Sequence, residues 1–148
     1  MAFVRRTLCG LVAFLTVALG MGVLSSAANA AVDNCGSSAA YSGSAEGRID
    51  NGILRAGFCI GAGKLRRINL EYEKNNGDTS TTVKLGYQRT DSSGVGISSP
   101  IYGTAQTVTK GHTISQSFSA DDPVACYHGV MLNTLTGFQY VTKVWGSC

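Results

Sequence analysis

The sequence predicts an all-β fold, a small antiparallel sandwich or barrel of about six to eight short strands, with little or no helix. Three observations support this prediction. Apolar and polar residues alternate over much of the chain, turn-forming residues recur at regular intervals, and four cysteines remain once a predicted leader is removed. We expect those cysteines to staple the fold with two disulfides.

The clearest strand pattern lies in residues 64–89, where apolar side chains occupy every second position on both sides of Asn76-Gly77. Alternation around an Asn-Gly pair predicts a β-hairpin with a two-residue turn. In that register the apolar side chains of both strands fall on one face. The predicted cross-strand pairs are Ile68 with Leu85, Leu70 with Val83, and Tyr72 with Thr81.

Six further segments have strand-like composition and are separated by Gly, Asp, Asn, Ser or Pro. These are residues 53–60, 97–102, 105–109, 113–118, 124–132 and 138–145. We place turns at residues 61–63, 91–96, 110–111, 121–123 and 133–137. The segment most like a helix, residues 33–46, is small and polar rather than amphipathic, so no helix is predicted there.

Residues 1–30 have the pattern of a cleaved signal peptide. Paired arginines precede an uncharged apolar run over residues 8–24, and two alanines separated by one residue end at Ala30. A positive start, an apolar core and small residues before the cut are the marks of such a signal. We therefore predict cleavage after Ala30 and one secreted, extracellular β domain over residues 31–148.

An uncleaved membrane anchor is the alternative, because a run of about 17 apolar residues approaches the length that crosses a bilayer. An anchor needs no alanine cleavage site, however, so we favour cleavage and expect no membrane contact afterwards. Arg5-Arg6 also raises the twin-arginine export route. Val4 and Thr7 around the pair match that signal poorly, which favours general secretion.

The charge of the mature domain gives no support for a nucleic-acid partner. The whole chain has 12 Lys and Arg against 9 Asp and Glu. Because Arg5 and Arg6 leave with the signal while no acid does, the remaining net charge is about +1. Nucleic-acid binding requires a concentrated basic footprint, and we expect none here.

The cysteines of the predicted mature domain are Cys35, Cys59, Cys126 and Cys148. Four cysteines allow three connectivities, among which we favour Cys35 with Cys59 and Cys126 with Cys148 because both spacings suit local closure of neighbouring strands. A metal site is not expected. There is no C-x-x-C pair, and neither histidine has the spacing from a cysteine pair that zinc sites show.

No catalytic constellation is evident, and no cofactor is predicted. The segment GFCIGAGK at residues 57–64 superficially looks like a phosphate loop, but Phe58 stands where that motif needs its first glycine, and Leu65 replaces the Ser or Thr that holds magnesium. His112 and His128 are the two histidines, and no G-x-S-x-G nucleophile elbow accompanies them. A small secreted hydrolase that pairs one of these histidines with an acid remains an alternative.

Aromatic side chains suggest a second alternative, a carbohydrate or cell-envelope binding module. If they were exposed together, four of them would form a flat surface for stacking on sugars or for binding protein. These are Tyr102, Tyr127, Tyr140 and Trp145. For Trp145, which lies near Cys148, packing in the core is the preferred interpretation.

The leading hypothesis is a secreted, non-enzymatic binding protein that presents loops to an extracellular protein, as small inhibitors do. It is motivated by the compact stapled frame and by the lack of a catalytic motif. The loop at residues 91–96 and the tip at residues 110–112 are the candidate contacts. A polysaccharide is the alternative partner.

Overall fold

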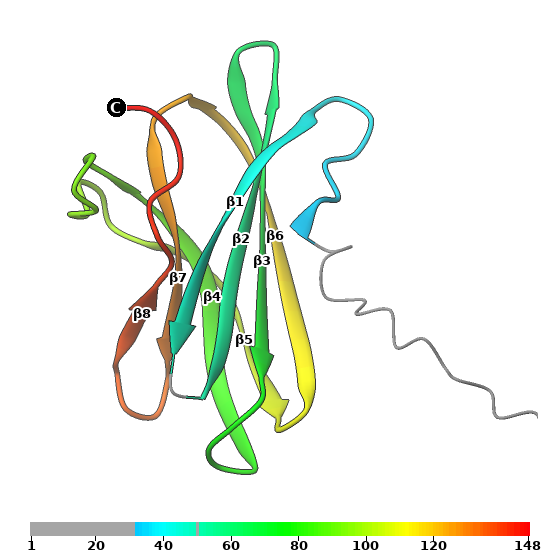
Figure 1. The fold of residues 1–148 in the computed structure, drawn as a ribbon, viewed down its shortest axis with the longest axis vertical. Helices are drawn as coiled ribbons and strands as arrows, with labels where there is room; N and C mark the ends of the chain where they lie inside the picture. The colour runs from blue at the N-terminus through cyan, green and yellow to red at the C-terminus, as the bar shows by residue number, and fades with distance from the viewer. Residues whose placement is uncertain (1–31, 50) are drawn as a thin grey trace, which may run out of the picture.

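The computed structural model describes residues 32–49 and 51–148, and within them the regular elements are eight β-strands (Figure 1). All strand pairs are antiparallel. The all-β prediction is therefore confirmed. The strands are β1 (Ala40–Ile49), β2 (Gly52–Gly61), β3 (Lys64–Lys74), β4 (Ser80–Thr90), β5 (Ile101–Thr109), β6 (His112–Pro123), β7 (Cys126–Asn133) and β8 (Gln139–Val141).

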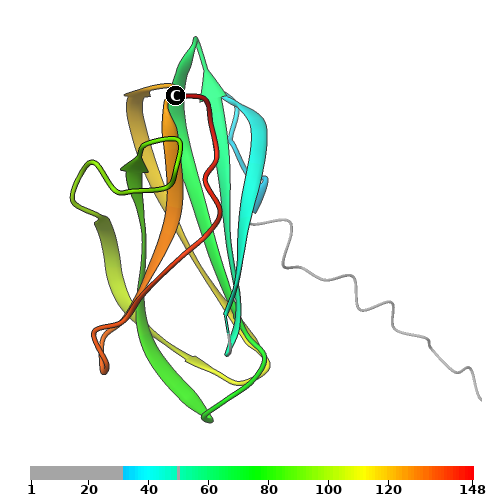
Figure 2. The same cartoon turned by 60° about the vertical axis from the view of Figure 1, so that its left-hand side comes forward.

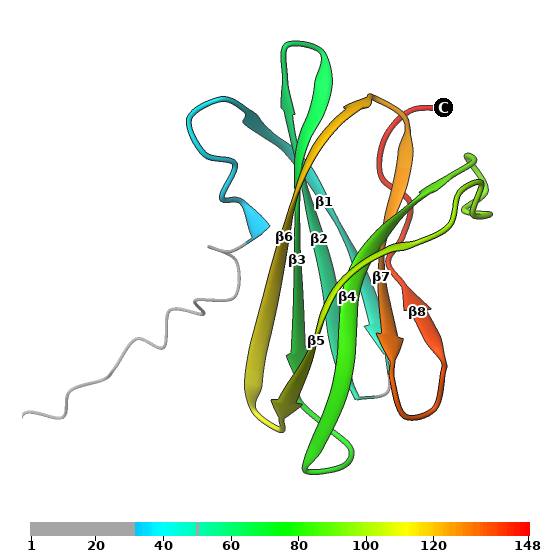
Figure 3. The same ribbon diagram turned by 180° about the vertical axis from the view of Figure 1, so that it is seen from behind.

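The strands form two four-stranded sheets packed face to face as a sandwich (Figures 1 and 3). One sheet has the order β1-β2-β3-β6 and the other has the order β5-β4-β7-β8. The core between them is built from alternate residues of the central strands, because successive side chains of a strand point to opposite faces. Ile68, Leu70 and Tyr72 of β3 are buried opposite Val83 and Leu85 of β4.

The predicted hairpin of residues 64–89 is wrong, because β3 and β4 belong to different sheets. Leu70 pairs with Ala56 and Gln116, and Val83 pairs with Gln106 and Asn133. The apolar alternation correctly identified the buried face of each strand. It could not identify the partner, since two strands facing each other across a core show the same alternation as two strands side by side.

The loop between β3 and β4 is held by the β1–β2 connection instead of closing on itself. The backbone amides of Asn75 and Asn76 both donate to the carbonyl oxygen of Asn51, at 3.1 and 3.2 Å. Gly77 has a φ of +74°, as expected of a glycine in a turn. The Asn-Gly signal therefore marks a turn inside a longer crossover between the sheets.

Three other sequence expectations need correction. Strand β1 lies largely in residues 33–46, where no strand was predicted. Residues 97–102 and 105–109 were expected to be two strands, but the structure has one strand there, β5, which begins only at Ile101. Residues 121–123, expected to turn, are the end of β6.

The two disulfides join Cys35 to Cys59 and Cys126 to Cys148, which confirms the favoured pairing. The first ties the segment before β1 to β2, and the second ties the last residue of the chain to the start of β7. Among the described residues, no helix is long and apolar enough to cross a membrane. The predicted signal peptide, residues 1–30, lies outside the described residues.

Candidate functional site

The most prominent connection is the loop over residues 91–100, between β4 and β5, which projects from one end of the sandwich (Figure 2). One carboxylate oxygen of Asp91 accepts hydrogen bonds from the Ser93 amide at 2.9 Å, the Ser93 hydroxyl at 2.7 Å and the Val95 amide at 2.9 Å. The Ser93 and Val95 hydrogen bonds lower the pKa of Asp91. This network orders the tip of the loop.

The second half of the loop is anchored to β4. The Ile97 amide donates to the Arg89 carbonyl at 2.9 Å, and the Gln88 side-chain amide donates to the Ser98 carbonyl at 2.6 Å. The loop therefore has a defined shape, and it turns apolar side chains outward. Val95 is 62% exposed and Ile97 is 58% exposed.

His128 supports this loop from beneath. It is 4% exposed, and its Nε2 lies 2.9 Å from the Gln88 Oε1 atom. Because the Gln88 nitrogen donates to Ser98, its oxygen faces the histidine, which assigns the imidazole proton to Nε2. Burial lowers the pKa of His128, so the neutral ring is favoured.

A pocket of about 180 Å³ opens beside the loop, between the edges of the two sheets. Its apolar wall includes Ile101, which is 51% exposed, and the ring of Tyr127, whose hydroxyl donates to the Pro123 carbonyl at 3.1 Å. Burial raises the pKa of Tyr127, which keeps its phenol neutral. The lining residues are Tyr87, Arg89, Ser98, Ile101, Asp122, Pro123 and Tyr127.

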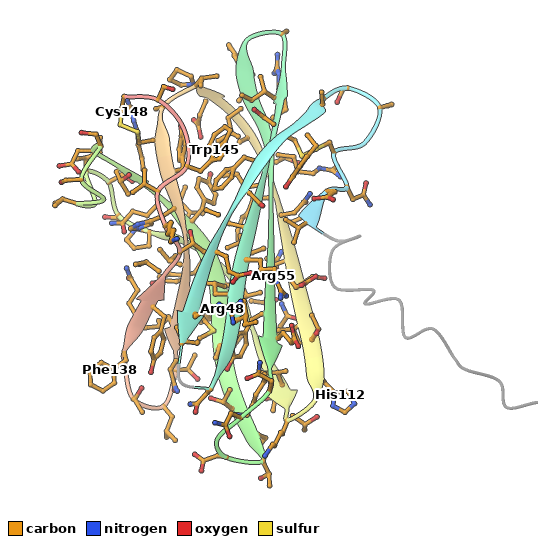
Figure 4. All side chains as sticks on the ribbon, in the orientation of Figure 1. Arg48, Arg55, His112, Phe138, Trp145 and Cys148 are labelled. Atoms are coloured by element: carbon orange, nitrogen blue, oxygen red, sulfur yellow. A yellow bond between two sulfur atoms is a disulfide. The ribbon has the colours of Figure 1, made fainter. Side chains whose placement is uncertain are left out.

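Other segments extend the surface around the loop. Val124, in the β6–β7 turn, is 40% exposed. The terminal residue Cys148 lies at this same end of the molecule (Figure 4). A Cβ added to Gly94 would lie 3.1 Å from Val144, so the loop tip and the C-terminal segment are close neighbours.

The structure does not bring the four candidate aromatic residues onto one face. Tyr127 is in the core, and the Trp145 ring is stacked on Phe58 with centroids 4.3 Å apart. Tyr102 lies on the outer face of the β5-β4-β7-β8 sheet, where its hydroxyl donates to Gln139 at 2.7 Å. Tyr140 points between the sheets at the opposite end from the loop.

The two histidines lie at opposite ends of the molecule and have different contacts. His112 is exposed at the start of β6, and its Nδ1 lies 2.9 Å from the Thr109 hydroxyl (Figure 4). His128 contacts Gln88, as described above. Within residues 32–49 and 51–148 we find neither histidine hydrogen-bonded to an acid or serine, and no cluster of His, Cys, Asp or Glu suited to a metal.

Three glutamates that could have paired with a histidine as a catalytic acid are instead engaged in ion pairs. Arg55 contacts Glu71 and Glu73, each at 3.1 Å, and it also contacts Glu46 at 3.3 Å. Burial raises the pKa of Glu71 despite the opposing effect of Arg55. Arg55 is a residue of β2, and Figure 4 places it near the middle of the molecule, away from the loop. This cluster stabilises a sheet face.

The segment before β1 covers part of the same sheet face. The Asn69 amide nitrogen donates to the carbonyl oxygens of Val32 and Asn34, at 3.1 and 2.8 Å. Gly57 is required under this segment, since a Cβ there would lie 2.1 Å from the Val32 carbonyl oxygen. Residues 32–35 are therefore an integral layer of the domain.

Sequence reasoning selected residues 91–96 as a contact loop but missed the pocket beside it. Val95 and Ile97 were available as a signal, because apolar side chains in a Gly- and Ser-rich loop lack an evident place in the core. The pocket lining comes from strands and turns distant in sequence, so no local pattern marks it. Searches of protein-family models, curated proteins and solved structures found no match to this chain.

Proposed function

We propose that this β-sandwich is a secreted, non-enzymatic binding domain that contacts an extracellular protein through the loop surface, defined as residues 91–101 with Val124. The observation that carries the proposal is an ordered loop that holds Val95, Ile97 and Ile101 outward beside a side-chain-sized pocket. Exposed apolar side chains that cluster at one place on a small domain are typical of interaction sites.

The order of the loop supports the same conclusion. A loop that is already in its bound shape loses little conformational entropy on association, which favours affinity. Asp91, Gln88 and His128 supply that order through hydrogen bonds at the tip and base of the loop. The pocket is large enough to accept one partner side chain, with Arg89 and Asp122 at its rim for polar contacts.

A crosslinking and capture experiment with extracellular proteins and proteases tests this proposal. Val95→Asp combined with Ile97→Asp is expected to abolish capture or inhibition of any partner that the native protein retains, because charges would replace apolar contacts. Leu135→Asp is the matched control. Leu135 is 90% exposed on the β7–β8 turn, at the other end of the molecule, and its replacement should leave binding unchanged.

A second variant distinguishes the contribution of loop order from that of the apolar side chains. Asp91→Ala leaves every apolar side chain of the loop surface in place but removes the hydrogen bonds that order the tip. We expect weaker binding and faster amide exchange at Ser93 and Val95, with strand amides unaffected. Equal binding by the native protein and the Val95→Asp/Ile97→Asp variant, with both folded, would show that the loop surface is not the contact site.

A further inference from the structure

We infer that the opposite end of the sandwich holds a separate binding site for a neutral oligosaccharide. Two adjoining hollows occur there, a cavity of about 110 Å³ between the sheets and a groove of about 440 Å³ along the turns. Thr81 and Asn133 line both, so the hollows are direct neighbours. The groove is within the range of about 300 to 1,000 Å³ typical of small-molecule sites.

The lining has the chemistry of a polyol site. Amide and hydroxyl groups dominate, including those of Asn51, Thr81 and Asn133, and Asp78 is the single charged lining residue. Such groups both donate and accept hydrogen bonds, as sugar hydroxyls do. Because no Lys, Arg or His lines either hollow, the described walls offer no cation to a phosphate or carboxylate ligand.

Several of these polar groups have hydrogen-bonding capacity to spare. Within the described parts of the chain, we find no hydrogen bond made by the Tyr140 hydroxyl, the Asn51 side chain or the Asp78 carboxylate. The Tyr72 hydroxyl reaches the Asn51 carbonyl only at 3.5 Å. Asn133 donates weakly to Thr81, at 3.4 Å. A ligand with several hydroxyls would satisfy these groups together.

Aromatic rings supply the apolar part of the site. Tyr72 and Tyr140 form one wall of the inner cavity. Phe138 follows the turn residues that line the groove but is not itself a lining residue; it is 67% exposed and points away from the core (Figure 4). A sugar ring has one face of C–H groups, which packs on an aromatic ring while its hydroxyls bond to the polar walls.

The site is held in shape before any ligand arrives. The Thr134 amide and hydroxyl donate to the Thr82 carbonyl, at 3.0 and 2.9 Å, which joins the β7–β8 turn to β4. The Asn133 side-chain oxygen accepts from the Leu135 and Thr136 amides. A rigid site loses little entropy on binding, and this compensates for the modest strength of neutral hydrogen bonds.

Titration of the ¹⁵N-labelled, disulfide-bonded protein with cellotetraose, chitotetraose and maltotetraose tests this inference by NMR. At least one of these sugars is expected to shift the amides of Asn51, Thr81 and Asn133. Tyr140→Phe should weaken that binding about five- to tenfold, as loss of one ligand hydrogen bond does. Tyr41→Phe, an exposed tyrosine on β1, is the matched control and should change nothing.

Absence of shifts with all three sugars at millimolar concentration, or shifts located only at the loop surface, would overturn the inference. If the Tyr140→Phe and native proteins bound the sugar with equal affinity, the role of Tyr140 in contacting the sugar would be overturned. The sugar site and the proposed protein contact lie at opposite ends of the sandwich. The Val95→Asp/Ile97→Asp variant should therefore bind the sugar normally. Failure of one proposal is thereby distinguishable from failure of the other.

Discussion

The two ends of the sandwich are built by different means. At one end, a ten-residue excursion over residues 91–100 lies near the C-terminal segment and exposes apolar side chains. At the other end, the β1–β2, β3–β4 and β5–β6 connections are linked by backbone hydrogen bonds, such as Lys110 to Thr79 and Gly111 to Lys74, and the β7–β8 turn is bonded to β4. The first end has the features of a protein contact and the second those of a polar ligand site.

One hydrophobic core supports both of the proposed sites. The same β4 strand leads from the groove at Thr81 and Thr82 to the loop anchor at Gln88 and Arg89. Between these two ends, Val83, Leu85 and Tyr87 of β4 are buried in the shared core. Connections tolerate variation because they contribute little to the core, and binding residues accumulate there.

Loss of the C-terminal disulfide should produce the largest difference between the ends. Cys126→Ser with Cys148→Ser is expected to lower the free energy of unfolding by about 3 kcal/mol, from the entropy regained by the unfolded chain. Amide exchange should accelerate at residues 91–100 and 142–148 and stay slow in the β3–β4 loop. Denaturant unfolding with exchange mapping measures both effects.

The other disulfide is the control for that experiment. Cys35→Ser with Cys59→Ser opens a loop of similar sequence separation, 24 against 22 residues. A similar loss of stability is therefore expected, but the exchange should accelerate at residues 32–39. Uniform acceleration over the molecule in both variants would contradict the view that the ends are separately organised.

Replacing one glycine at each end should have a smaller effect on stability than removing a disulfide. Gly94 at the loop tip and Gly111 in the β5–β6 turn have φ values of +89° and +83°. Alanine at either position should cost about 1 to 2 kcal/mol from backbone strain. Gly94→Ala should cost more, because its Cβ would meet Val144 at 3.1 Å whereas Gly111 has nothing within 4 Å. Equal unfolding midpoints for the Gly94→Ala and Gly111→Ala variants would show that the Val144 side chain moves aside at no cost in stability.

Acidification should weaken the loop end selectively. Burial lowers the pKa of His128, whereas the unfolded chain takes up a proton near the ordinary value of about 6.5. The stability that neutral His128 contributes is therefore fully present above that pH and is lost as pH falls through the lower folded pKa. Comparison of denaturation midpoints at about pH 7.5 and pH 5 measures this loss.

His128→Gln should reduce the pH dependence and keep a hydrogen-bonding side chain next to Gln88. His112→Gln is its matched control, since His112 is exposed at the opposite end. If both variants show the native pH dependence, acids elsewhere in the molecule govern it.

Much of the fold followed from local patterns. Alternation identified the buried faces of β3 and β4, and the spacing of the cysteines favoured the two bonds that occur. Strand β1 was not predicted, because its small polar residues show no strong alternation of apolar and polar side chains. The strand forms through its pairing with β2. The candidate sites were harder. Tyr140 was named as a candidate, but the cavity that it lines was not predicted. Tyr127 was a candidate only if it were exposed, and it is 2% exposed.

The sequence by itself determined the fold class, the disulfide candidates and the predicted leader, because each depends on residue types at short spacing. Only the tertiary structure decided that β3 and β4 face each other across the core and that the loop surface and the polar groove lie at opposite ends. Period-two alternation specifies which side of a strand is buried. The neighbour that buries it depends on packing among all eight strands, which no single segment encodes.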